Sequence, residues 1–130
     1  MKKIVAFISG SIMLAFISLA SFTLKEDDCK IMHSGTFIYG DPGFEVKVVI
    51  KGNKHTEYHD NGRYFIKSKL TWLSDCEYDM TMTDVTIPNF PYKVGDVMNV
   101  KIDKVDGDKI YYTSTVQGKS WQGKFIKIKD

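Results

Sequence analysis

The stretch from residue 63 to residue 85 constrains the fold of this chain most strongly. It contains two runs in which apolar and polar residues alternate, separated by a short turn at residues 73–75. Successive side chains of a β-strand point to opposite faces, so this alternation predicts a pair of antiparallel strands with one buried face. The residues on that face are Tyr64, Ile66, Ser68, Leu70 and Trp72 in the first run, and Tyr78, Met80 and Met82 in the second.

Turn signals divide the rest of the chain into further short strands. Asp41-Pro42-Gly43 and Asn61-Gly62 are the clearest, since proline presets φ and glycine tolerates a positive φ. In 44–51 the apolar residues from Phe44 to Ile50 share one face, and a change of parity in 120–129 predicts a bulge near Gly123. The other predicted strands are 30–40, 55–60, 97–105 and 109–116.

About eight strands joined in order by short turns predict an all-β fold with the topology of an antiparallel meander. Eight strands suffice to close into a small barrel, and closure removes exposed strand edges. We therefore expect a small lipocalin-like barrel over residues 30–130, after an N-terminal signal helix. An open sheet or a two-layer sandwich is the alternative.

The N-terminus has the pattern of an export signal. Lys2 and Lys3 precede an uncharged run from 4 to 24, and Ser18 and Ala20 are small residues suited to cleavage after Ala20. This predicts a signal peptide over 1–20, a flexible lead-in over 21–29, and a periplasmic or extracellular domain. The alternative is an uncleaved membrane anchor extending to residue 24, because the run is long enough to span a bilayer.

Removal of the signal changes the interpretation of the charge. The full chain has 18 basic and 16 acidic side chains, and loss of Lys2 and Lys3 leaves 16 of each. Nucleic-acid binding needs a surplus of Lys and Arg on one surface. The sequence therefore predicts no nucleic-acid partner, and a membrane contact only if the signal remains uncleaved.

Cys29 and Cys76 are the two cysteines of the chain, and both lie after the signal. An even number of cysteines in an oxidising compartment favours a disulfide. A reactive Cys76 thiolate is the alternative, but the neighbouring Asp75 and Glu77 would raise its pKa.

Three polar residues, His55, Glu57 and His59, share one face of a predicted strand. Neighbours two positions apart lie about 7 Å from each other and could contribute two zinc ligands, whereas the outer pair is about 13 Å apart. A further ligand would have to be His33, the remaining histidine. The alternative, which the sequence favours, is a solvated face of a polar hairpin. No cofactor is predicted.

Phe90 and Tyr92 lie on a proline-containing connection, outside the patterned strands. Aromatic side chains at the mouth of a barrel can bind an apolar or sugar-like ligand, so these two are the candidate ligand-binding residues. The alternative is that they cap the end of the barrel. The chain has no nucleophile elbow and no phosphate-binding loop, so no catalytic residue is predicted.

The chain resembles a group of small exported bacterial β-proteins of unknown function. The resemblance is carried by Cys29-Lys30, residues 34–37, Glu57-Tyr58, residues 70–72 with Asp75-Cys76 and Tyr78, and the closing residues 125–128. It implies an exported β-domain and no particular site residue. Some members are labelled DNA topoisomerase IV, an activity that requires far larger ATP-binding and DNA-cleavage domains.

Three functional hypotheses follow from these observations. The first is a non-enzymatic module that binds a small ligand or an envelope protein. The second is a structural or interaction module tethered by its N-terminal helix. The third is a metal-dependent hydrolase that uses the three polar residues of 55–59 with His33.

Overall fold

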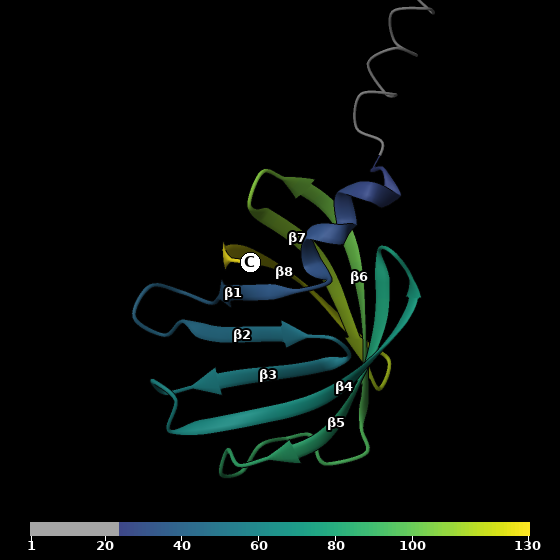
Figure 1. Cartoon of the computed structure of the whole chain (residues 1–130). Coiled ribbons are helices and arrows are strands. Elements are labelled where there is room, and N and C mark those ends of the chain that lie inside the picture. The colour runs from purple at the N-terminus through teal and green to yellow at the C-terminus, as the bar shows by residue number, and fades with distance from the viewer. Residues whose placement is uncertain (1–23) are drawn as a thin grey trace, which may run out of the picture.

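The strands of the protein close into a barrel in which each strand pairs with the next along the chain. The structure is a computed structural model that describes residues 24–130 (Figure 1). All eight pairings are antiparallel, including the pairing of β8 with β1 that closes the barrel. The predicted all-β meander and its closure are confirmed. The elements are η1 (Glu26–Met32), β1 (Gly35–Tyr39), β2 (Val46–Lys51), β3 (Lys54–His59), β4 (Tyr64–Ser74), β5 (Glu77–Val85), β6 (Val97–Asp106), β7 (Lys109–Val116) and β8 (Lys119–Lys129).

The strand pair β4 and β5 has the register and faces that the alternation predicts. Leu70 lies opposite Met80, and Trp72 lies opposite Tyr78. Ile66, Ser68, Leu70, Tyr78, Met80 and Met82 are all buried. This hairpin makes the most extensive strand contact in the barrel and supplies much of its core.

The short 3-10 helix η1 lies where the sequence predicts the end of a lead-in and the start of a strand. Cys29 and Met32 are fully buried, whereas Glu26, Asp27 and Asp28 are exposed. A 3-10 helix has three residues per turn, so Cys29 and Met32 lie on one face, and that face packs into the core. The strand predicted from Lys30 therefore begins only at Gly35.

The disulfide between Cys29 and Cys76 joins η1 to the turn between β4 and β5. The S–S distance is 2.04 Å, and the two residues are 47 positions apart in the sequence. The predicted pairing is confirmed. The N-terminal segment is thereby attached to the strand pair with the clearest pattern.

Two predicted details of the barrel are wrong. Phe44 is 85% exposed, because it belongs to the turn and β2 begins only at Val46. The predicted bulge near Gly123 is absent from the regular β7–β8 register, and the register shift that involves β8 lies near Ile128, where β8 pairs with β1. Glycine is needed at 123 because a Cβ there would clash with the ring and hydroxyl of Tyr112.

Among residues 24–130, no helix is long and apolar enough to cross a membrane. The predicted signal peptide at 1–20 lies outside the described residues, and so does its predicted cleavage point.

Candidate functional site

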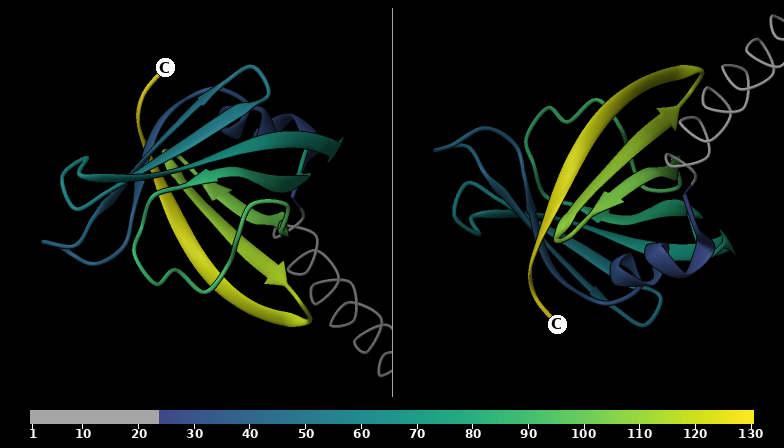
Figure 2. Two further views of the ribbon diagram at one scale, coloured as in Figure 1. Left: turned by 90° about the horizontal axis from the view of Figure 1, so that it is seen from below. Right: turned by 90° about the horizontal axis from the view of Figure 1, so that it is seen from above.

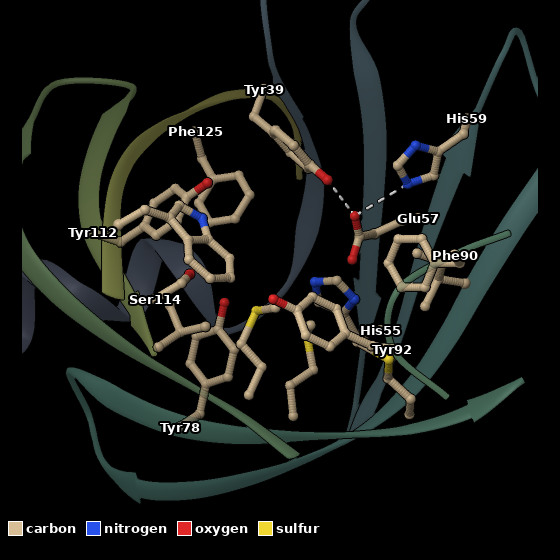
Figure 3. Close-up of a pocket in the computed structure, with 16 residues that line it drawn as sticks. Tyr39, His55, Glu57, His59, Tyr78, Phe90, Tyr92, Tyr112, Ser114 and Phe125 are labelled. Atoms are coloured by element: carbon tan, nitrogen blue, oxygen red, sulfur yellow. Dashed lines mark hydrogen bonds and ion pairs between the residues drawn. The ribbon is translucent and has the colours of Figure 1, made fainter. Parts of the chain in front are cut away.

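A cavity of about 230 Å³ lies inside the barrel (Figure 3). Its wall is made of inward side chains from seven strands, and the loop between β5 and β6 completes it. Seen from below, this loop extends in front of β8 (Figure 2). The lining residues are Tyr39, His55, Glu57, His59, Ile66, Tyr78, Met80, Met82, Phe90, Tyr92, Met98, Val100, Tyr112, Ser114, Trp121 and Phe125.

Three polar residues of β3, His55, Glu57 and His59, line this cavity. His55 is 2% exposed and Glu57 is 7% exposed. Their inward direction follows from register, because His55 lies opposite Ile50 and Glu57 lies between Val48 and Ile66. The solvated face that the sequence favours for these residues is therefore wrong.

Glu57 is the centre of a small polar cluster in the cavity wall. The Tyr39 hydroxyl donates a hydrogen bond to Glu57 Oε1. His59 Nε2 lies 3.4 Å from the same oxygen, which is close enough for an ion pair when His59 is protonated, although it is outside hydrogen-bonding geometry. Figure 3 shows all three side chains converging from β1 and β3.

The surroundings of Glu57 favour its ionised form. Burial raises the pKa of the carboxyl, but the nearby His59 and His55 imidazoles and the Tyr39 hydroxyl lower it by more, so its net pKa lies below 4.5. The carboxyl therefore carries a negative charge at neutral pH, in a wall that otherwise consists mainly of apolar and aromatic side chains.

Three tyrosine hydroxyls of the cavity, those of Tyr39, Tyr78 and Tyr112, remain protonated at neutral pH. Burial, followed by the Glu57 charge, raises the pKa of Tyr39 and raises the pKa of Tyr112 to about 12. Burial is also the main cause of the raised pKa of Tyr78, with smaller contributions from Tyr112 and Glu57. The Tyr78 and Tyr112 hydroxyls can therefore donate hydrogen bonds into the cavity, whereas the Tyr39 hydroxyl already donates its proton to Glu57.

Two of the most deeply buried polar groups of the cavity lack a partner. Within residues 24–130, neither the Tyr78 hydroxyl nor His55 Nδ1 has a hydrogen bond. Buried polar groups in proteins are nearly always hydrogen-bonded, and an unpaired one costs about 1–3 kcal/mol. These two atoms are therefore available to a molecule inside the cavity.

The buried imidazole of His55 makes the stability of the barrel depend on pH. Burial lowers the pKa of His55 below 6.5, despite the opposing effect of the Glu57 charge. As the pH falls, the histidine of the unfolded chain is therefore protonated before that of the folded chain. The free energy of unfolding is at its full value above the unfolded pKa. It decreases below about pH 6.5, by at most about 1.4 kcal/mol per pH unit.

We expect this loss between pH 6.5 and 5 in urea unfolding, and we expect His55→Leu to reduce it. Glu57 contributes in the same direction, but only as the pH approaches its own lower pKa. An identical slope in the wild type and in His55→Leu over this pH range would contradict the assignment.

The structure brings together the two predicted aromatic residues and three of the four predicted metal ligands. Phe90 and Tyr92 pack edge to face, with ring centroids 5.8 Å apart, and both line the cavity. His33 lies elsewhere, stacked on Trp72, with Nε2 2.9 Å from the Asp75 carbonyl oxygen. No group of three His, Cys, Asp or Glu residues within 24–130 is placed to hold a metal ion.

Sequence reasoning missed Tyr39 and Ser114 as residues of the site. Tyr39 follows Phe37 by two positions, and Ser114 follows Tyr112 by two. The alternation of strand faces therefore contained a signal for both. Tyr39 was overlooked because it lies at the end of its strand, directly before the turn that begins at Gly40.

The cavity combines one buried carboxylate, two imidazoles, protonated tyrosine hydroxyls and several aromatic rings. This combination can hold a small molecule by ring contacts and by hydrogen bonds. The chain matches no protein-family model, and no curated protein or solved structure is significantly similar to it.

Proposed function

We propose that the protein is a non-enzymatic module that binds a small, largely apolar ligand with a polar group inside the barrel. The observation that carries the proposal is the pair of buried, unpaired polar atoms, Tyr78 Oη and His55 Nδ1, in the cavity wall. A cavity of about 150 Å³ in another protein accepts benzene, so about 230 Å³ has room for one ring with a short substituent.

The same proposal places the domain outside the cytoplasm, in the periplasm or the extracellular space. The disulfide between Cys29 and Cys76 supports this, because disulfides persist mainly in oxidising compartments. The charged start and uncharged run of residues 2–24 support it independently.

A titration with 2-phenylethanol tests the binding function, because this neutral probe has one aromatic ring and one hydroxyl. Isothermal calorimetry is expected to show saturable binding of one molecule per chain. The largest amide shifts in nuclear magnetic resonance spectra are expected at cavity residues such as Tyr78 and Tyr112. Shifts confined to the outer faces of the strands, or no saturation, would contradict the proposal.

Tyr78→Phe is expected to change stability and binding in opposite directions. Removal of an unpaired buried hydroxyl should raise the free energy of unfolding by about 1 kcal/mol, while loss of its hydrogen bond should weaken 2-phenylethanol binding about threefold to tenfold. Urea unfolding and calorimetry measure the two effects.

Tyr111→Phe is the matched control, because Tyr111 lies on β7 beside Tyr112 but does not line the cavity. It should leave the affinity for the probe unchanged. A Tyr78→Phe protein that is less stable than the wild type would show that the hydroxyl already has a partner.

A further inference from the structure

Among the described residues, the cavity wall contains one carboxylate and no permanently charged base. Among the described residues that line it, Glu57 is the one carboxylate, and none is a lysine or an arginine. The histidines are the remaining titratable bases, and burial holds His55 in its neutral form. A carboxylate removed from water is costly unless charge or hydrogen bonds compensate for it.

Both contacts that the structure gives for the Glu57 carboxylate are made to Oε1. Glu57 receives the Tyr39 hydrogen bond, and His59 approaches without hydrogen-bonding geometry. Tyr78 and Tyr112 face the same cavity as neutral hydroxyls. A negatively charged ligand would meet the Glu57 charge at close range, and this repulsion disfavours fatty acids and other carboxylates.

The aromatic residues of the wall add a second preference for positive charge. Tyr112 and Phe125 are stacked with centroids 4.3 Å apart, and Tyr39 meets Phe125 edge to face at 5.6 Å. Phe90, Tyr92 and Trp121 line the cavity and are only partly buried. The faces of aromatic rings are electron-rich and attract cations, including ammonium groups.

From this geometry we propose that the ligand is a small organic cation, a protonated amine or quaternary ammonium carried on a body of about one ring. Its positive group pairs with the Glu57 carboxylate, and its apolar body contacts the aromatic rings and the methionines of β5 and β6. This inference rests on the proposed binding function and specifies the chemical class of the ligand.

Three probes of nearly the same size and different charge test the inference. They are 2-phenylethylamine, which is protonated at pH 7.5, neutral 2-phenylethanol, and the anion 3-phenylpropionate. We expect the amine to bind at least about tenfold more tightly than the alcohol, because hydrogen bonds to charged groups contribute about 1.5–3 kcal/mol. The anion is expected to bind most weakly.

A fourth probe, the N,N,N-trimethyl derivative of the amine, shows whether the site prefers a protonated amine or a quaternary ammonium. Tighter binding of the primary amine indicates a hydrogen bond to the carboxylate, and tighter binding of the derivative indicates stacking on the rings. Either result supports a cation site when the affinity exceeds that of the alcohol.

Glu57→Gln removes the charge and nearly preserves the shape of the side chain. It is expected to reduce amine binding about tenfold and to leave alcohol binding nearly unchanged. Glu45→Gln is the matched control, because Glu45 is an exposed carboxylate before β2 and does not line the cavity. If Glu57→Gln does not fold, Trp121→Leu provides a second test, because Trp121 lines the cavity and is partly exposed. This substitution should reduce the affinity for the amine more than the affinity for the alcohol.

The outcomes separate this inference from the binding function. If the alcohol binds in the cavity as tightly as the amine, or if the anion binds best, the cation inference is wrong and the binding function stands. If no probe binds, both are wrong. Equal loss of amine and alcohol affinity in Glu57→Gln would also overturn the cation inference.

Discussion

Replacement of Phe37 by alanine is expected to lower the free energy of unfolding by about 3–5 kcal/mol. The side chain is 0% exposed and packs against Phe125, with ring centroids 6.2 Å apart. It lies on β1, where the barrel closes through the pairing of Phe37 with Lys127. Its loss would leave a cavity at this closure, because close-packed neighbours relax only partly. Urea unfolding followed by circular dichroism measures the change.

Phe44→Ala is the matched control for this prediction. The two residues are of the same type and are seven positions apart, but Phe44 is 85% exposed. Its replacement should change the stability by no more than about 0.5 kcal/mol. Equal losses in the two variants would contradict the burial that the structure assigns to them.

Removal of the disulfide is expected to have the second large effect. In the Cys29→Ala/Cys76→Ala variant the free energy of unfolding should fall by about 2–4 kcal/mol, because the bridge closes a long loop and restricts the unfolded chain. The 47-residue separation places the chain-entropy value near the upper end of this range, at about 4 kcal/mol.

Loss of the disulfide should also destabilise η1 more than it destabilises the strands. The helix is held by the disulfide and by the burial of Cys29 and Met32, whereas the strands retain their pairing. Amide hydrogen exchange is expected to increase most at Glu26–Met32. Wild-type protein treated with dithiothreitol should behave like the variant, and the variant should not respond to the reductant. Unchanged stability in both cases would refute a structural role for the bridge.

The strand pairs were predictable because their signals are local. In β4 and β5 a sustained alternation of large apolar and polar residues determines both the type of element and the buried face. Gly43 and Gly62 have positive φ in turns at the predicted positions. Phe44 was misplaced because alternation alone does not show where a turn ends and a strand begins.

The inner face of β3 was not predictable in this way. Both faces of Lys54–His59 are polar, so the strand has no apolar stripe to distinguish inside from outside. The decision came from its neighbours, because pairing with β2 and β4 places His55 and Glu57 beside Val48, Ile50 and Ile66. Residues that resemble a solvated face in the sequence therefore became the polar part of the cavity.

The class of the fold, the number and order of the strands, and the pairing of the two cysteines were predictable from the sequence. These properties depend on neighbours in the chain, or on the presence of two cysteines. Tertiary structure alone decided that the barrel contains a cavity and that Glu57 faces it beside Tyr39. The volume left inside a barrel depends on the sizes of side chains that meet from all of its strands, and no local pattern contains that information.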